Sequence, residues 1–314
     1  MRVVIFGTGG VGGYFGGRLA QAGQEVIFIA RGEHLRAIQT QGLRVDSVLG
    51  DLMIHPAQAV SDPAQVGPVE VVLVCVKAWQ VAAAAQAIQP MVGPETLVVP
   101  LQNGVDAPAE LAAVLGAAPV VGGLCGLIAF VAGPGHIRHT GIEPFVTFGE
   151  LDNRPSQRIE RLRQAFARTK GVMVNVPADI KAAMWRKFLL IATWSGVGAV
   201  THAPIGVLRS VPETRQMLEQ SLWEIYRVAV AHHIALPEEV VGQTLTFIDT
   251  IPPYGTASMQ RDIMAGRPSE LASQNGAVVR LAREAGVATP LHNFIYSSLL
   301  PLELRARGEV EFSL

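Results

Sequence analysis

One short segment near the start of the chain constrains the fold more than any other. The apolar run Arg2–Phe6 leads directly into Gly7-Thr8-Gly9-Gly10-Val11-Gly12, which has the spacing G-x-G-x-x-G. A helical pattern over Val11–Ala22 follows, ends before Gly23, and gives way to a second apolar run over Glu25–Ala30. The order strand, glycine-rich turn, helix, strand predicts a βαβ unit whose two strands are parallel.

Each glycine of this turn has a physical role in binding the pyrophosphate of a dinucleotide. Gly7 permits the tight turn, Gly9 lets the phosphates approach the backbone, and Gly12 lets the helix pack closely against the strand. The start of the helix adds amide donors and the positive end of its dipole. We therefore expect a Rossmann-type domain whose cofactor site is lined by Gly7, Thr8, Gly9, Gly10, Val11 and Gly12. The alternative is a glycine-rich turn that holds no ligand.

The end of the second strand indicates which dinucleotide is bound. Enzymes that use NAD place an acidic residue there, which accepts hydrogen bonds from the ribose hydroxyls. This chain has Ala30-Arg31 instead, and an arginine pairs with a 2′-phosphate through two parallel hydrogen bonds. Glu33 lies close by, but it follows Arg31 in the loop. We expect NADPH; the alternative is that Arg31 is only a solvated loop charge.

The chain changes from alternating strands and helices to helices alone. The first part contains apolar runs typical of strands covered on both faces and one alanine-rich helix: Val69–Val76, Leu97–Pro100, Val120–Val131, Phe145–Gly149 and the helix Trp79–Ile88. We expect the runs from Val120 onwards to extend the same sheet. The second part contains long helical patterns: Ala178–Thr201, Pro212–His233, Glu238–Ile248 and Ser269–Ala285. The last has Ser269 as its expected N-cap and Gly286 just past its end.

This pattern predicts an α/β fold in two domains. An N-terminal domain with a Rossmann-type parallel sheet is expected over residues 1–176, followed by an all-helical C-terminal domain over residues 177–314. The cofactor belongs to the first domain, and the substrate and the catalytic residues belong to the second.

Composition and charge exclude several classes of protein. The chain has 314 residues, of which 49% are apolar, so it has enough material for two large cores. Its 25 basic and 26 acidic side chains nearly cancel, which argues against binding to nucleic acid or to a membrane surface. The longest uncharged stretch, Leu111–Ile137, is broken by proline and glycine and favours a buried strand over a membrane span. We expect a cytoplasmic protein with no bound metal, no signal peptide and no structural disulfide between Cys75 and Cys125.

Further motifs resemble those of the ketopantoate reductase (2-dehydropantoate 2-reductase) family. They occur in order along nearly the whole chain: Gly7-x-Gly9-x-x-Gly12, Val76-Lys77-Ala78-Trp79-Gln80, Leu101-Gln102-Asn103-Gly104, Trp185-Arg186-Lys187-Phe188, Ser258-Met259-Gln260-Arg261-Asp262-Ile263 and Gly266-Arg267-Pro268-Ser269-Glu270. Together they are much more specific than the glycine-rich turn alone. The resemblance implies a Rossmann domain and a helical domain, with NADPH and a 2-oxo acid meeting in the cleft.

The resemblance also implies roles for single residues. Lys187 corresponds to the family's catalytic acid, and Glu270 to a glutamate that helps hold the substrate and that we also assign to the cofactor site. Ser258 resembles the serine that contacts the substrate carboxylate. Asn103 corresponds to the asparagine between cofactor and substrate, and Lys77 matches a lysine at the cofactor cleft.

The chemistry of ketone reduction accounts for these residue types. Negative charge develops on the oxygen as hydride reaches the carbon, so a nearby ammonium stabilises that charge and delivers a proton, worth about 10²- to 10⁴-fold. Structural alternatives exist: Lys187 as a solvated helix charge, Glu270 as an acid at a helix start, and Ser258 as a helix cap. The ordered set of family motifs favours the catalytic interpretation.

Two positions depart from the family pattern. Lys187, Ile191 and Ser195 are spaced four residues apart and share one helix face. In the family, the positions four and eight after the lysine are commonly asparagines that reach the substrate. Ile191 and Ser195 therefore stand at substrate-binding positions, where Ile191 makes the wall of the pocket more apolar. These departures weigh against ketopantoate itself and favour a related 2-oxo acid with a more apolar tail.

The sequence thus predicts NADPH-dependent reduction of a 2-oxo acid to a 2-hydroxy acid. The first candidate reaction is ketopantoate to pantoate, in pantothenate biosynthesis. One alternative is another two-domain hydroxyacid or opine-type dehydrogenase, and another is a non-catalytic NADP(H)-binding sensor. The presence of both Lys187 and Glu270 speaks against the sensor. The expected partner is a small molecule, with neither nucleic acid nor membrane, and the chain is expected to be a monomer or a homodimer.

Overall fold

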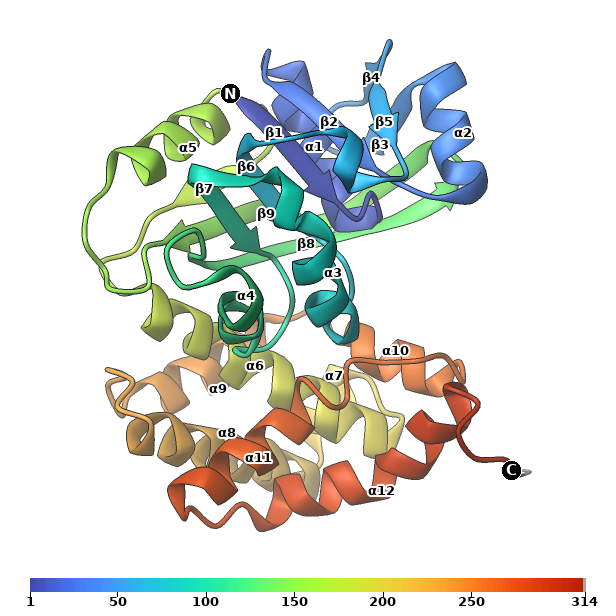
Figure 1. The fold of residues 1–314 in the computed structure, drawn as a ribbon. Helices are drawn as coiled ribbons and strands as arrows, with labels where there is room; N and C mark the ends of the chain where they lie inside the picture. Colours follow the sequence, from blue (N-terminus) through green and yellow to red (C-terminus); the bar gives the residue numbers. More distant parts are fainter. Residues whose placement is uncertain (313–314) are drawn as a thin grey trace. The chain divides into compact units, whose positions relative to one another are not determined.

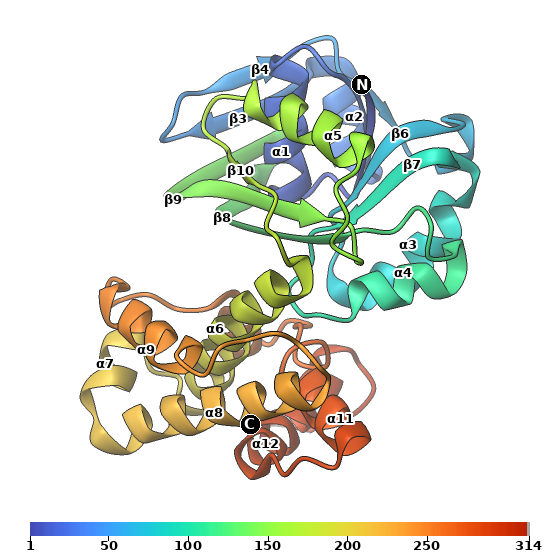
Figure 2. The ribbon, with the colours of Figure 1, turned by 90° about the vertical axis from the view of Figure 1, so that its left-hand side faces the viewer.

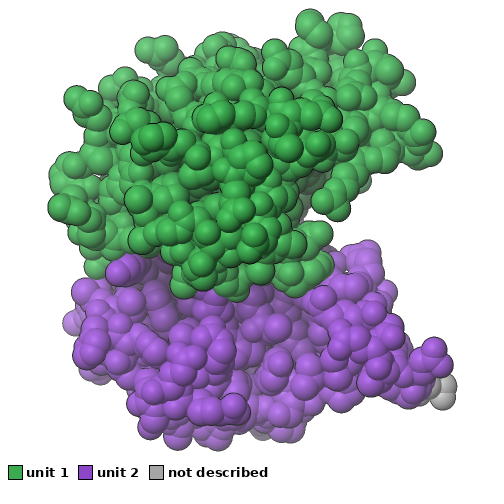
Figure 3. Space-filling model, viewed as in Figure 1, with its two compact units in different colours: residues 1–102, 107–180 green, residues 103–106, 181–314 purple. Residues whose placement is uncertain are grey.

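The computed structural model describes residues 1–312 and divides into two compact units. The first, which we call the sheet unit, comprises residues 1–102 and 107–180; the second, the helical unit, comprises residues 103–106 and the chain from 181 onwards (Figure 3). The segment 103–106 thus belongs to the helical unit although it lies far from it in sequence. The parallel sheet in the N-terminal half and the helices in the C-terminal half confirm the predicted fold class.

The first sheet of the sheet unit is parallel, as the apolar runs predict. Its strand order is β5-β2-β1-β6-β7, with bounds Gln58–Val60, Glu25–Ile29, Arg2–Phe6, Val69–Val74 and Val92–Pro100 (Figure 1). The helices of this unit are α1 (Gly10–Gln21), α2 (Gly32–Gln41), α3 (Val81–Ile88), α4 (Ala107–Leu115) and α5 (Gln157–Ala167), with short 3-10 turns at Pro63–Gln65, Ala78–Gln80 and Gln89–Met91. The order reverses between β1 and β6, and such a switch point opens a binding crevice at the carboxyl ends of the strands.

The prediction that the later runs extend this sheet is wrong. They form a second sheet with β3 (Leu43–Ser47), β4 (Leu52–Ile54) and β10 (Met173–Asn175), in which β8 (Gly122–Gly133) pairs antiparallel with β9 (His136–Gly149). An isolated bridge from Val98 to Val120 links this region to β7. The turn after β8 reverses the chain directly, so β9 pairs with β8 itself rather than crossing over to the first sheet.

Helix α1 lies between the two sheets, and its glycines explain how it fits there (Figure 2). A Cβ atom on Gly16 would lie 2.6 Å from Ile5 of the first sheet. On the adjoining face, a Cβ atom on Gly13 would lie 2.6 Å from Ile137 of the second sheet. Both distances are too short for a real side chain, so these glycines let the helix approach both sheets closely. The glycine-rich helix therefore fixes the position of the turn that precedes it.

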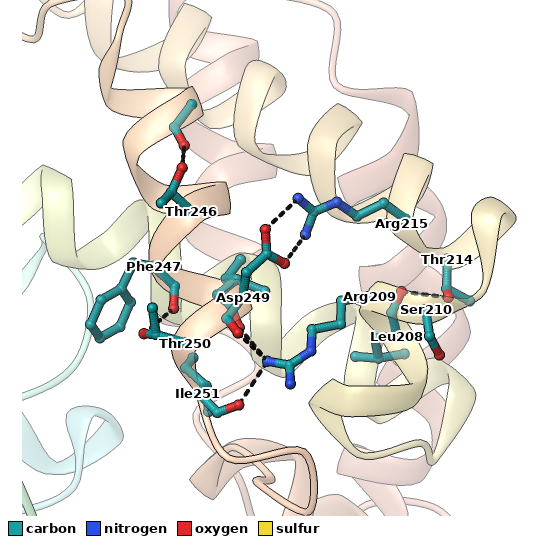
Figure 4. Close-up of polar contacts among 12 residues, drawn as sticks. Leu208, Arg209, Ser210, Thr214, Arg215, Thr246, Phe247, Asp249, Thr250 and Ile251 are labelled. Carbon is teal, nitrogen blue, oxygen red and sulfur yellow. Dashed lines mark hydrogen bonds and ion pairs between the residues drawn. The ribbon is translucent and has the colours of Figure 1, made fainter.

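The helical unit contains α6 to α12, which pack around a core of their own. Their bounds are Ile180–Thr201, Ile205–Ser210, Pro212–Ala231, Val240–Thr250, Ser258–Met264, Asn275–Ala285 and Pro290–Ala306. Arg209 of α7 donates hydrogen bonds of 3.0, 2.8 and 2.7 Å to the carbonyls of Ile248, Asp249 and Ile251 (Figure 4). Carbonyls in the last turn of a helix need partners from outside the helix, and of these three only that of Ile248 also accepts a backbone hydrogen bond in the described chain, from the C-cap N–H of Ile251. The guanidinium therefore caps the end of α9.

The helix predicted from Ser269 to Ala285 begins later than expected. It starts at Asn275 and ends, as predicted, before Gly286 in the left-handed conformation. Ser269 does not cap it, because its hydroxyl and its N–H both donate to the buried Glu303 carboxylate, at 2.5 and 3.0 Å. Residues 271–274 instead form a turn, and Glu270 lies in the bend before it. This places Glu270 on an irregular segment, where it is not simply an acid stabilising a helix start.

Within residues 1–312, no helix combines the length and the apolar character that crossing a membrane requires.

Candidate functional site

The glycine-rich turn has the geometry that a pyrophosphate requires. Gly7 follows β1 with φ of 101°, and a Cβ atom on it would lie 3.0 Å from the backbone nitrogen of Val76, just after β6. A Cβ atom on Gly12 would collide with the carbonyl oxygen of Gly7. At Gly9, by contrast, a Cβ atom would meet nothing within 4 Å among the described residues. The turn is thus tight on its inner side and open at the one glycine where phosphates approach.

The amides at the start of α1 are available to an anion. Gly9 is the N-cap of α1, and among residues 1–312 no side chain caps this end and no acidic side chain occupies its first turn. Uncapped amides at a helix start attract phosphate through hydrogen bonding and the helix dipole. The residues present therefore fit the pyrophosphate of a dinucleotide, which Gly7, Thr8, Gly9, Gly10, Val11 and Gly12 would hold.

His34 holds this turn in place, and the sequence analysis missed it. Its Nε2 lies 2.8 Å from the Thr8 carbonyl oxygen, and its Nδ1 accepts a 3.0 Å hydrogen bond from the Gly135 amide. Only a neutral ring with its proton on Nε2 satisfies both contacts. Burial lowers the pKa of His34, in agreement with this. No sequence signal points to His34, because its partners lie in the turn before α1 and in the β8–β9 turn.

Arg31 and Lys77 both follow strands that flank β1. Arg31 is exposed and is the N-cap residue of α2, directly after β2. Glu33 is directed to another cation, since its Oε1 lies 3.9 Å from the guanidinium of Arg36. Lys77 is exposed after β6, with its Nζ 5.8 Å from the centre of the Trp79 ring. The two cations lie at the carboxyl ends of β2 and β6, the edge at which ligands bind in such sheets.

Three of the predicted residues meet in the helical unit. The Nζ of Lys187, on α6, donates a 2.9 Å hydrogen bond to Oδ1 of Asn103. The Nδ2 of the same Asn103 donates a 3.1 Å hydrogen bond to Oε2 of Glu270. Lys187 and Asn103 are half-buried, and Glu270 is buried. The amide oxygen of Asn103 thus accepts from the ammonium, and its NH₂ group donates to the carboxylate. This matches the two charged groups, because an ammonium only donates hydrogen bonds and a carboxylate only accepts them.

The turn that carries Asn103 is docked onto the helical unit by its next three residues. Gly104 has φ of 107°, and a Cβ atom on it would lie 2.7 Å from the carbonyl oxygen of Ser273. Val105 packs against the helical core, and Asp106 forms a 2.6 Å ion pair with Arg280 of α11. Only glycine permits both the backbone conformation and the close approach at residue 104. The motif therefore positions Asn103 through its glycine.

A fourth residue, Gln274, continues this chain of polar contacts. Its Nε2 lies 3.4 Å from Oε2 of Glu270, and its Oε1 accepts a 2.5 Å hydrogen bond from the hydroxyl of Ser195. The hydroxyl of Ser195 also contacts the carbonyl oxygen of Ile191. Gln274 and Ser195 are both fully buried. Ser195 therefore reaches the cluster through Gln274, which the sequence analysis did not identify.

The side chains of the other two predicted substrate residues, Ile191 and Ser258, are not part of these contacts. Ile191 is half-buried, one turn along α6 from Lys187. Ser258 is half-buried and is the first residue of α10, whose N-cap is Ala257, so Ser258 is not the helix cap. Within residues 1–312, no hydrogen bond joins Ser258 to Lys187, Asn103 or Glu270. The hydroxyl of Ser258 is therefore not part of this cluster.

The described residues contain no group of three histidine, cysteine, aspartate or glutamate side chains arranged to hold a metal ion. The polar cluster instead offers an ammonium, an amide and a carboxylate. An ammonium positioned by a hydrogen bond to an amide is suited to donate a proton to an oxygen that gains negative charge. This is the chemistry of carbonyl reduction.

The family was established by comparison with known proteins. The family model described as ketopantoate reductase PanE/ApbA matches residues 3–153, and the one described as ketopantoate reductase PanE/ApbA C terminal matches residues 179–303. The chain belongs to the ketopantoate reductase family. This is a family of NAD(P)-dependent oxidoreductases that act on small 2-oxo acids, which agrees with the site described above.

Individual relatives cover nearly the whole chain. A 2-dehydropantoate 2-reductase of Halobacterium salinarum is 31% identical and covers 93% of this chain and 95% of its own. A crystal structure of a PanE/ApbA family ketopantoate reductase from Ralstonia eutropha has 31% identity and a TM-score of 0.88, over 98% of this chain and 100% of the other. A structure of D-mandelate dehydrogenase with NADH has 23% identity and a TM-score of 0.87, over 98% and 100%, and this likeness shows the fold alone. The fold by itself therefore decides neither the substrate nor the cofactor.

Proposed function

We propose that this protein reduces a 2-oxo acid to a 2-hydroxy acid with NADPH, and that ketopantoate is the first substrate to test. The observation that carries the proposal is the contact series from Lys187 through Asn103 to Glu270. Three residues from separate motifs of the sequence meet there within hydrogen-bond distance. A glycine-rich turn with uncapped amides supports dinucleotide binding in the same chain.

Each residue of the cluster has a task in carbonyl reduction. Lys187 donates a proton from Nζ to the carbonyl oxygen as that oxygen becomes negative. Asn103 holds Nζ in place through its Oδ1 and so positions the ammonium. Glu270 accepts a hydrogen bond from a polar group of the substrate, and Ser258 binds the substrate carboxylate. A bound NADPH supplies the hydride.

Two observations bear on which 2-oxo acid is reduced. Relatives named 2-dehydropantoate 2-reductase, among them one from Nostoc with 29% identity over 98% of this chain, support ketopantoate. Ile191 supports a substrate with an apolar tail, because it presents no hydrogen-bonding group one helical turn from Lys187. Ketopantoate has both a polar end and a branched apolar centre, so it satisfies the two observations.

Arg31 supports NADPH over NADH. It is exposed directly after β2, where the ribose of a bound dinucleotide lies in this fold, and Glu33 is directed toward Arg36. An arginine at this position neutralises a 2′-phosphate through two hydrogen bonds. Lys77, after β6, adds a second positive charge near the phosphate-binding turn.

The test is NADPH oxidation, followed at 340 nm, by the purified protein with ketopantoate and with a panel of 2-oxo acids that bear smaller, larger and aromatic tails. Turnover of ketopantoate with the highest kcat/KM supports the full proposal. Turnover of another 2-oxo acid alone keeps the reaction and replaces the substrate. Absence of turnover with every acid, while NADPH still binds, contradicts the proposal and favours a sensor.

A further inference from the structure

Gln274 occupies an unusual place among the residues next to the catalytic cluster. Its side chain is fully buried, yet both polar ends are engaged with groups of the site, Ser195 on one side and Glu270 on the other. A buried amide is costly unless it is hydrogen-bonded, and an apolar side chain of the same size would fill the space without that cost. The amide therefore has a role beyond filling the core.

The carboxylate of Glu270 dictates which way the amide of Gln274 faces. A carboxylate oxygen only accepts hydrogen bonds, so the NH₂ group must point to Glu270 and Oε1 must point to Ser195. The single proton of the Ser195 hydroxyl then lies between two acceptors, Oε1 and the carbonyl of Ile191. The orientation of the amide is thus determined at both ends.

Glu270 is held by two amides that approach the same oxygen. Nδ2 of Asn103 lies 3.1 Å from its Oε2, and Nε2 of Gln274 lies 3.4 Å from it. Two donors from different directions restrict rotation of the carboxylate about its last bond. Asn103 also holds Lys187, so any rotation of Glu270 is transmitted to the ammonium through Asn103.

We propose that Gln274 is a positioning residue that fixes the carboxylate of Glu270 for the substrate, with Ser195 fixing Gln274 in turn. This inference rests on the proposed reduction of a 2-oxo acid. It also gives a role to Ser195, one of the two positions that depart from the family pattern: its hydroxyl donates to the amide of Gln274.

The experiment compares Gln274→Met with the wild type, because methionine has the same length and lacks both hydrogen-bonding groups. The assay uses the 2-oxo acid that the wild type reduces best, over a range of pH, with thermal unfolding and NADPH affinity measured in parallel. We expect KM for the acid to rise about 10-fold, from the loss of one hydrogen bond to a charged group, with NADPH affinity unchanged. Ser195→Ala is expected to raise KM in the same direction and by less.

Two further variants separate positioning from general stability. Asn275→Ala removes an amide that is as buried as that of Gln274 and adjacent to it in sequence. The Nδ2 of Asn275 donates to the carbonyl of Ala192 and not to the cluster. This variant is expected to lower the unfolding temperature and leave KM unchanged. In a Glu270→Ala background, Gln274→Met is expected to have no further effect on KM, because the carboxylate that Gln274 positions is already absent.

The outcomes distinguish the inference from the proposed function. If the wild type is active and Gln274→Met keeps its KM, or if its effect adds fully to that of Glu270→Ala, the positioning role is wrong and the reductase stands. If Asn275→Ala raises KM as much as Gln274→Met does, the effect is one of stability and the role is again wrong. If the wild type reduces no 2-oxo acid, the proposed function fails and the inference fails with it.

Discussion

The two candidate sites of this molecule differ in the groups that form them: backbone forms one, and side chains form the other. The proposed phosphate-binding turn of the sheet unit consists of backbone: tight glycines, one open glycine and the uncapped amides of α1. The proposed catalytic cluster of the helical unit consists of side chains from separate segments, with Asn103, Lys187 and Glu270 joined through one amide. The first site follows from a continuous stretch of sequence, whereas the second exists only once the chain has folded.

This difference has a physical consequence for how each site fails. A backbone site is lost when a side chain fills the space or when the local conformation changes, so substitutions act there through shape. A side-chain site is lost one functional group at a time, and its effects are coupled through shared hydrogen bonds. Substitutions at each site therefore test whether the two fail in these different ways.

Replacement of Lys187 by Met should lower kcat by about 10³-fold, the middle of the range for general acid catalysis. The affinity for NADPH should stay within about 2-fold of the wild type, because the amides of α1 are unaffected. Stopped-flow turnover and fluorescence titration measure the two quantities. A variant that loses NADPH binding together with turnover would contradict the separation of the two sites.

Gly9→Ala should weaken NADPH binding by about 30-fold, the value of a favourable anion contact at a helix start. The unfolding temperature should not change, because the φ of Gly9 is −84° and its Cβ would meet nothing within 4 Å in the described chain. Gly242→Ala is the matched control, since its Cβ also meets nothing within 4 Å of described atoms. An equal loss of NADPH affinity in both variants would refute the assignment of Gly9.

The helical unit should lose stability in mild acid through His292. Its Nε2 lies 2.9 Å from the hydroxyl of Ser221, its Nδ1 lies 3.1 Å from Nδ2 of Asn275, and burial lowers its pKa from 6.5 to about 4. The unfolded chain therefore binds a proton that the folded chain rejects. Stability is full above pH 6.5 and is lost as the pH falls toward 4, by about 2 kcal/mol between pH 7 and pH 5.

The control for this prediction is His292→Gln, which keeps a polar side chain and cannot titrate. Urea unfolding of the wild type and of this variant at pH 7 and pH 5 isolates the share of His292 from that of other histidines. The wild type should lose more stability over this interval than the variant does. Identical losses would mean that His292 is not the group responsible.

Arg31→Ala should have the smallest effect. Loss of one ion pair to the 2′-phosphate is expected to weaken NADPH about 10-fold and to leave NADH unchanged. Dissociation constants for both nucleotides, measured by titration, give the ratio directly. A variant that weakens both equally would show that Arg31 does not recognise the 2′-phosphate.

The local sequence was sufficient to predict the features of the fold that depend on residues close together in the chain. The turn from Gly7 to Gly12, its flanking strands, the long helix that carries Lys187 and the stop at Gly286 all follow from short-range patterns. The second sheet was not foreseen, because the pairing of β9 with β3 joins residues about a hundred positions apart. Ser269 was misassigned as a cap because the competing acceptor, Glu303, lies on a distant helix.

The candidate site shows the same division. The family motifs named Asn103, Lys187 and Glu270, and the structure brings these three together. Neither Gln274 nor His34 carries a local signal, since the role of each depends on partners that only the fold supplies. A glutamine after Glu270 reads as an ordinary polar residue until its burial and its two contacts are known.

The most direct test of the proposed reduction follows the hydrogen that NADPH transfers to the 2-oxo acid. The wild-type protein is incubated with ketopantoate and NADPH that carries two deuterium atoms on carbon 4 of the nicotinamide, and the product is analysed by mass spectrometry and NMR. We expect the product to be pantoate with deuterium on carbon 2. A protein that binds NADPH but leaves ketopantoate and every other 2-oxo acid unlabelled and unreduced would contradict it.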